Sequence, residues 1–394
     1  MRILMVVKYP PIQGGVSIQN YWLAQTFAEL GHGVIVLTNA NEVEDEYCIQ
    51  LDREDRIKLT GFRKTGSIRV VSTEFNGSEF HVPNSKLFGS KLLSLGLEVV
   101  EEFRPDFIYA HYVEPYGVVA MNLSAMTGIP YTIKHAGSDL GKLSLLPQLK
   151  TLHEQVYRRA ILVATQGKHH PYFNKIGVEA NRLTVLGFKP WPADVFMPTD
   201  PPPYDGIYQL LIYGKTGRSK GTDQLLDALS KYGSERPAIK VAAYWGGKHF
   251  LKYKDKILSL GLVERKLLEL HPYVPHWKIA EAIRQSHAVL YLENDFKISI
   301  HGPGIPFEIL GSGRSLVTTE EIASKYPGLI NESNSEIIMG TPLKAEDLLD
   351  TLSRIAQVNR VTQSLETCVD FDELYAVGIR NVERFLLRVE RSLH

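Results

Sequence analysis

Cysteine, net charge and long apolar runs are all scarce in this chain of 394 residues. The two cysteines, Cys48 and Cys368, stand far apart and form neither a disulfide framework nor a metal-binding spacing, which favours a reducing compartment. Lysine plus arginine and aspartate plus glutamate number 44 each, so the chain has no overall field that would recruit nucleic acid. The first apolar run, Ile3–Val7, is far shorter than the roughly 20 residues that a membrane span needs. We expect a cytoplasmic protein without a nucleic-acid partner.

Strand and helix patterns alternate along the first half of the chain. A buried strand at Ile3–Val7 precedes a glycine-rich loop, a helix that we expect Ser17 to cap, and a second strand at Gly33–Thr38. Helices are expected at 90–103 and 118–127, and strands at 107–110, 131–133 and 161–164. This βαβ order predicts a parallel sheet with helices on both faces.

The alternation restarts after a proline-dense stretch at 187–203, which is typical of a hinge between domains. Strands are expected at 210–213, 239–244, 288–292 and 315–318, and helices at 223–232 and 277–286. We therefore predict an α/β protein with an N-terminal Rossmann-like domain (1–190), a hinge (191–206), a C-terminal Rossmann-like domain (207–372) and a final helix (373–394) that returns toward the N-terminal domain. In open α/β sheets ligands bind at the carboxyl ends of the strands, so the two sheets should face each other across a cleft.

A glycine- and lysine-rich turn, 214–221, lies between an expected strand and an expected helix. Glycines at such a turn let the backbone approach a phosphate, and Lys215 and Lys220 add positive charge that the helix N-terminus reinforces. A P-loop is excluded because Gln209 stands where its first glycine is required. A phosphorylated ligand is favoured, with a solvated basic turn as the alternative.

A second turn, 301–313, contains glycines and Pro306 before a short expected helix that Gly313 ends. Glu308 on that helix is an acceptor beside the predicted anion site, which suits the hydroxyls of a ribose better than a phosphate. The alternative is a glutamate that only favours the first turn of its helix.

These segments resemble, in the correct order, those of retaining GT-B glycosyltransferases of family four. The similar segments are Gly14-Gly15-Val16, Pro105 to His111, Gly128 to Asp139, the hinge from Leu186 to Pro198, Gly214 to Gly221 and His301 to Gly313. The resemblance covers nearly the whole chain. It implies two Rossmann-like domains with parallel sheets facing across a cleft.

The resemblance also implies roles for individual residues. Lys215 and Lys220 would hold the diphosphate of a nucleotide-sugar donor, Glu308 the ribose, and His135 the transferred sugar. The other implied donor-binding residues are Gly14, Gly15, Gly214, Val274, His301, Gly304 and Ile305. His301 stands where the family has the first of two glutamates, and one residue is missing before Glu308, so the choice of sugar is open.

The implied reaction moves a sugar from the nucleotide diphosphate to an acceptor hydroxyl with retention of configuration. Two lysines can stabilise the charge that grows on the departing diphosphate, so we expect no metal and no other cofactor. Asp370-Phe371-Asp372 imitates a metal-binding pattern, but an acidic N-terminal turn of the final helix explains it better. The alternatives are a nucleotide-sugar epimerase or sugar phosphorylase on the same fold, and a non-catalytic nucleotide-sugar-binding subunit.

The partners are only partly specified. The donor would be a sugar carried by uridine or guanosine diphosphate, while the acceptor, a glycan, a lipid-linked glycan or a small molecule, is unknown. Lys142 to Lys150 with Arg158-Arg159 suit either a basic face for peripheral contact with the inner membrane surface or a solvated helix face.

Overall fold

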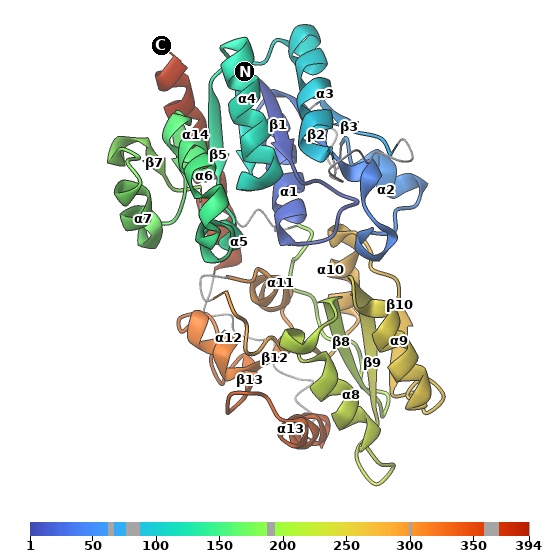
Figure 1. Ribbon diagram of the computed structural model, residues 1–394. Helices are drawn as coiled ribbons and strands as arrows, with labels where there is room; N and C mark the ends of the chain where they lie inside the picture. The colour runs from blue at the N-terminus through green and yellow to red at the C-terminus, as the bar shows by residue number, and fades with distance from the viewer. Residues whose placement is uncertain (62–66, 76–86, 187–193, 299–301, 358–369, 394) are drawn as a thin grey trace.

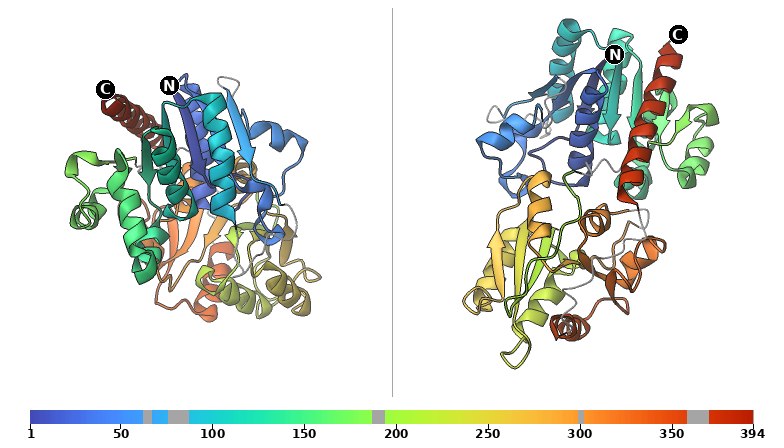
Figure 2. Two further views of the ribbon diagram at one scale, coloured as in Figure 1. Left: turned by 45° about the horizontal axis from the view of Figure 1, so that its top comes forward. Right: turned by 180° about the vertical axis from the view of Figure 1, so that it is seen from behind.

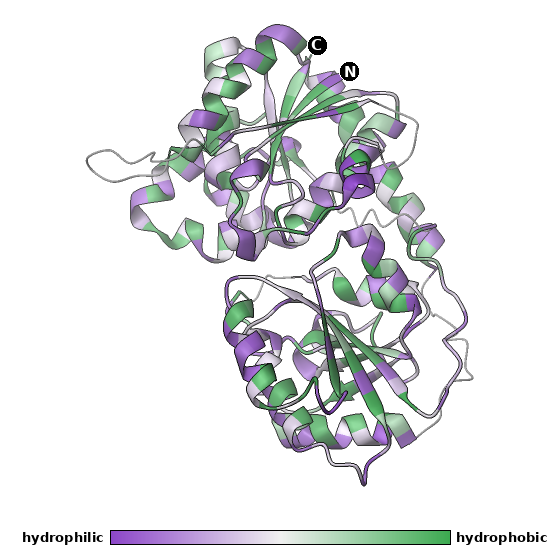
Figure 3. Cartoon of the chain, turned by 90° about the vertical axis from the view of Figure 1, so that its right-hand side faces the viewer, coloured by the Kyte–Doolittle hydropathy of each residue, from purple (hydrophilic) through white to green (hydrophobic). Residues whose placement is uncertain are grey.

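Two α/β units, one from each half of the chain, lie end to end (Figure 1). The computed structural model describes residues 1–61, 67–75, 87–186, 194–298, 302–357 and 370–393. Apolar strands form the interior of both units, and polar residues gather on the outer sides of their helices (Figure 3).

The N-terminal unit is a seven-stranded sheet in the order β3-β2-β1-β4-β5-β6-β7 whose neighbouring strands are all parallel. Its strands are β1 (Arg2–Val7), β2 (Gly33–Thr38), β3 (Ile68–Ser72), β4 (Phe107–His111), β5 (Tyr131–Lys134), β6 (Leu162–Ala164) and β7 (Leu183–Thr184). Its helices are α1 (Gly15–Glu29), α2 (Arg53–Lys58), α3 (Phe88–Phe103), α4 (Val118–Thr127), α5 (Gly137–Gly141), α6 (Pro147–Arg159) and α7 (His170–Lys175). Of the elements after β5, the strand predicted at 161–164 is observed as β6, whereas α5, α6, α7 and β7 were not predicted from the sequence.

The C-terminal unit is a six-stranded parallel sheet in the order β10-β9-β8-β11-β12-β13. Its strands are β8 (Tyr208–Lys215), β9 (Ile239–Gly246), β10 (Leu268–His271), β11 (Ala288–Tyr291), β12 (Ser315–Thr319) and β13 (Ser335–Ile338). Its helices are α8 (Thr222–Ser230), α9 (Phe250–Ser259), α10 (His276–Arg284), α11 (Ile305–Gly311), α12 (Glu320–Lys325) and α13 (Ala345–Gln357). The predicted α/β class with two parallel sheets is confirmed.

Helix α1 begins earlier than the sequence predicts. The expected cap, Ser17, lies buried inside the helix, and the N-cap position is taken by Gly14 with φ 122°. A backbone angle in this range favours glycine over the serine that usually caps a helix. The prediction of Ser17 as the cap was therefore wrong.

The last helix, α14 (Phe371–Leu393), lies against the N-terminal sheet although it follows the C-terminal one in sequence (Figure 2). The ring of Phe385 packs 6.2 Å from that of Tyr109 on β4, centroid to centroid. Arg388 donates a hydrogen bond of 2.7 Å to the carbonyl oxygen of Leu183 on β7. No described helix is long and apolar enough to cross a membrane.

Direct contacts join the two units. The amide of Gly247 donates to the carbonyl oxygen of Glu46 at 2.8 Å, and that of Gln50 to the carbonyl oxygen of Tyr273 at 3.1 Å. The indole of Trp277 donates to buried Asp55 at 2.9 Å. These bonds hold the carboxyl ends of both sheets toward each other.

Candidate active site

A cavity of about 1050 Å³ lies between the two units, at the carboxyl ends of their strands. The residues that the sequence assigns to the site line this cavity wherever they are described: Gly14, Gly15, His135, Gly214, Lys215, Lys220, Val274, Gly304, Ile305 and Glu308. His301 falls outside the described residues. Segments from both halves thus converge on one site, and the topological rule for parallel sheets explains why.

The N-terminal glycine loop meets the C-terminal lysine loop inside the cavity. A Cβ atom placed on Gly14 would lie 3.5 Å from Nζ of Lys8 and 3.7 Å from Nζ of Lys215. Burial lowers the pKa of Lys215, and repulsion from Lys220 lowers it further. Two ammonium groups brought together in this way create a local preference for an anion.

Lys8 is a site residue that sequence reasoning missed. Burial lowers the pKa of its amine to about 7, and repulsion by Lys215 adds to the effect. It directly follows β1, so the rule that placed Gly14 at the carboxyl edge of the sheet could also have found it.

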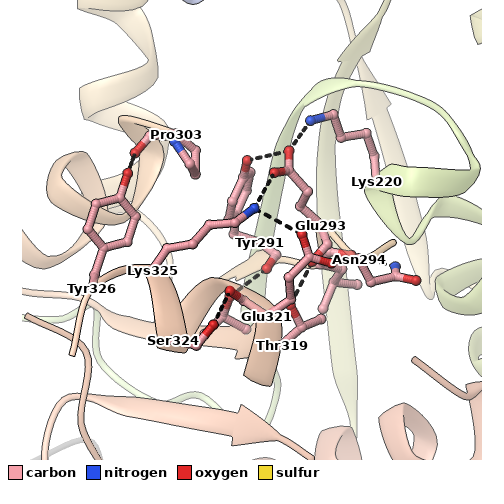
Figure 4. Close-up of polar contacts among 12 residues, drawn as sticks. Lys220, Tyr291, Glu293, Asn294, Pro303, Thr319, Glu321, Ser324, Lys325 and Tyr326 are labelled. Carbon is pink, nitrogen blue, oxygen red and sulfur yellow. Dashed lines mark hydrogen bonds and ion pairs between the residues drawn. The ribbon is translucent and has the colours of Figure 1, made fainter. Parts of the chain in front are cut away.

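Lys220 is held by a second missed residue, Glu293 (Figure 4). The Glu293 side chain is 0% exposed, accepts a bond from Lys220, and accepts one of 2.9 Å from the hydroxyl of Tyr291. Nζ of Lys325 lies 3.6 Å from the other Glu293 oxygen and 2.9 Å from Glu321. A diphosphate that engages Lys220 must therefore compete with a buried carboxylate.

Glu308 is buried at 3% exposure and engaged by its neighbours. Its Oε2 accepts a hydrogen bond of 2.7 Å from Tyr213, and its Oε1 lies 3.1 Å from Nε2 of His276. Nδ1 of the same imidazole accepts a bond of 2.9 Å from the indole of Trp22 on α1. Because Nδ1 is an acceptor, the ring proton of neutral His276 lies on Nε2, facing the carboxylate. These contacts, which run from α1 through α10 to α11, were not predicted from the sequence.

His135 is a neutral group in the cavity. Burial lowers the pKa of its imidazole to about 4, and a hydrogen bond to the backbone of Ala136 opposes that effect. Its Nε2 lies 2.8 Å from the hydroxyl of Thr165. A side chain in this state can orient a sugar hydroxyl but brings no positive charge.

The imitation of a metal site at the start of α14 is explained by capping. Asp370 accepts a bond of 2.9 Å from the amide of Glu373, as an acidic residue before a helix commonly does. Across the described ranges, no group of three or more histidine, cysteine, aspartate or glutamate residues could hold a metal ion.

Two stacked α/β units with a shared cavity at their strand ends define the GT-B class of fold. Residues 14–188 match the family model of the glycosyl transferase 4-like domain. The GT-B fold implied by the resemblance that the sequence motifs carry is confirmed. No curated protein sequence matches the chain.

Solved structures support the fold over the full length. HepE from Anabaena, solved with UDP and glucose, is 14% identical, with a TM-score of 0.65 and coverage of 100% of both chains. Sucrose-phosphate synthase from Thermosynechococcus elongatus is 14% identical, with a TM-score of 0.63 over 99% of this chain and 96% of that one. A putative UDP-N-acetylglucosamine 2-epimerase from Listeria monocytogenes is 12% identical, with a TM-score of 0.59 over 98% and 94%. Identities this low establish the fold alone.

Proposed function

We propose that this protein is a retaining glycosyltransferase that moves a sugar from a nucleotide diphosphate to an acceptor hydroxyl without a metal ion. One observation carries the proposal: the glycine loop before α1 and the lysine loop after β8 meet within one cavity, with Nζ of Lys215 3.7 Å from a Cβ atom built on Gly14. At this point the backbone of one domain and the charge of the other can contact the same diphosphate.

Charge development during transfer explains the lysines. Negative charge grows on the diphosphate as its bond to the sugar breaks, and groups that stabilise this charge accelerate the step. Lys215 and Lys220 supply the stabilising positive charge. Lys220 does so after it exchanges the Glu293 carboxylate for the diphosphate. In the retaining route that we propose, a donor phosphate oxygen takes the acceptor proton on the same face, and no protein nucleophile is needed.

The donor that we propose is a uridine diphosphate sugar. HepE of Anabaena, which shares the fold, has been solved with UDP-glucose. Glu308 would accept a bond from the ribose beside Tyr213, and the backbone at Val274 would meet the base. The acceptor would enter from the N-terminal domain, near His135.

Calorimetric titration with uridine, guanosine, adenosine and thymidine diphosphates in the presence of EDTA tests the donor site. We expect uridine diphosphate to bind, and Lys215→Met to weaken binding at least tenfold, because a charge-assisted hydrogen bond contributes about 1.5–3 kcal/mol. Lys254→Met on α9 is the matched control, since Lys254 is exposed and lies outside the cavity. Equal affinity in both variants would remove Lys215 from the site.

The products separate transfer from the alternative reactions. A glycosyltransferase releases uridine diphosphate only as its sugar appears on an acceptor or on water, and NMR of the new anomeric centre reports retention or inversion. An epimerase like the one named for the Listeria neighbour would change the sugar with no acceptor. Binding with no turnover across a panel of donors and acceptors would favour a non-catalytic subunit.

A further inference from the structure

The cavity holds more positive charge than a donor diphosphate requires. Its lysines are Lys8, Lys134, Lys168, Lys215, Lys220 and Lys325, whereas Glu308 is the one carboxylate among the described residues that line it. Lys220 and Lys325 both pair with Glu293, which is buried and does not line the cavity. Within the described ranges no carboxylate lies at ion-pairing distance from the other four lysines.

Lys134 is the lysine among these four whose position separates it from the donor loops. It ends β5, and its register partner on β4 is His111. Lys8, in contrast, stands beside Lys215 at Gly14 and belongs with the diphosphate. Lys168 is exposed. We therefore expect Lys134 to bind a part of the ligand other than the donor diphosphate.

The partners of Lys134 are all neutral. Nζ donates a hydrogen bond of 3.2 Å to Oε1 of Gln19 on α1. His111 is 1% exposed, with Nδ1 2.9 Å from Asn20, and burial lowers its pKa well below the usual value. The neighbouring His135 is likewise uncharged near neutral pH. An ammonium with one amide oxygen as its partner retains two donors for a ligand.

We propose that Lys134 anchors a second anion-binding subsite, which takes a phosphate or carboxylate carried either by the acceptor or by the transferred sugar. The inference rests on the proposed function for the placement of the diphosphate at Lys215 and Lys220. With those positions taken, Lys134 lies next in sequence to His135, the residue assigned to the sugar, and on the domain assigned to the acceptor.

The electrostatics of the Lys134 side chain agree with this assignment. Burial lowers the pKa of Lys134 to about 8, so the site makes the charge costly without supplying a counter-charge. A bound anion would offset that cost, which is the usual reason for a cation to stand in a partly buried pocket.

Two matched pairs of probes separate the two sources of the anion. For the acceptor source, glucose 6-phosphate and glucose are titrated calorimetrically into protein saturated with uridine diphosphate. For the sugar source, UDP-glucuronic acid is compared with UDP-glucose. We expect the charged member of one pair to bind at least tenfold more tightly than its neutral partner. We expect Lys134→Met to abolish that preference and Lys134→Arg to retain it.

The controls keep the outcome decisive. Lys150→Met, on the exposed face of α6, should leave the preference unchanged. Uridine diphosphate should bind Lys134→Met as it binds the native protein, which shows that the variant is folded. Equal binding within both pairs, or a preference that survives in Lys134→Met, would overturn the subsite. If uridine diphosphate fails to bind at all, the proposed function fails, and the phosphate pair titrated without it still decides whether Lys134 holds an anion.

Discussion

Glu293 pairs with Lys220 at the point where the donor is expected to place its diphosphate. The side chain is fully buried and joins Lys220 and Lys325, which lie 105 positions apart, at one point (Figure 4). We predict that Glu293→Gln tightens the binding of uridine diphosphate roughly three- to tenfold, because Lys220 no longer exchanges one anion for another. Titration calorimetry measures the change in affinity.

The same substitution should lower thermal stability, since it leaves two partly buried ammonium groups without their shared counter-charge. Glu321→Gln is the control: it removes a carboxylate 2.9 Å from Lys325 but does not touch Lys220. Unchanged or weaker binding in Glu293→Gln would show that Lys220 does not reach the diphosphate.

Sequence patterns predicted some site residues and missed others for a physical reason. Lys215 and Gly14 stand in glycine-rich turns after expected strands, where local composition alone predicts a loop that approaches an anion. Glu293 follows a strand with no such composition. Glu293 belongs to the site because it contacts Lys220, 73 positions away, and a contact at that separation cannot be predicted from a single sequence.

Helices α1, α10 and α11 are linked at element scale by Trp22, His276 and Glu308. The indole of Trp22 in the N-terminal domain donates a hydrogen bond of 2.9 Å to Nδ1 of His276. Nε2 of His276 lies 3.1 Å from Oε1 of Glu308, the carboxylate proposed to hold the ribose. We predict that His276→Asn lowers the preference for uridine diphosphate over its 2′-deoxy and 3′-deoxy forms, since Glu308 loses the imidazole that lies 3.1 Å from its carboxylate. A loss of about tenfold in this ratio is expected from competitive titration.

A ratio of affinities distinguishes positioning from simple destabilisation. His249→Asn, at an exposed position before α9, should change neither the ratio nor the melting temperature. A variant at position 276 that melts earlier but keeps the native ribose preference would make His276 a packing residue only.

Elements with a clear local pattern could be predicted, whereas the shortest strand could not. Helix α4 was predicted at its observed limits, 118–127, whereas β7 is two residues long and takes its strand character from its neighbour β6. Ser17 failed as a cap because α1 begins two residues before it, after Gly14, whose φ of 122° favours glycine.

At the scale of the whole molecule, α14 completes the domain that begins the chain. Val382, Phe385 and Val389 are each 0% exposed. We predict that Phe385→Ala lowers the free energy of unfolding by about 3–5 kcal/mol, because it leaves a cavity against Tyr109. Urea denaturation followed by circular dichroism measures the loss.

Leu387→Ala is the matched control on the same helix, since Leu387 is 53% exposed. Its cost should stay below about 1 kcal/mol. Similar losses in the two variants would mean that α14 contributes little to the fold of the first domain. The two-sheet architecture itself followed from the repeated βαβ pattern, but the domain limits of 1–190 and 207–372 stay a prediction, since 187–193 lies outside the described residues.

The two amide-to-carbonyl bonds at Gly247 and Gln50 have both partners in peptide groups. Replacing the Gln50 side chain leaves its bond to Tyr273 intact, so alanine scanning at Gln50 would overlook this contact between the domains, whereas any side chain at Gly247 is strained by its φ of 90°. Proline, which lacks an amide hydrogen, is the substitution that exposes the contact at Gln50. A protein engineer who wants the two domains to separate more readily would begin with Gln50→Pro, which removes one backbone bond between them and changes no charged residue of the cavity.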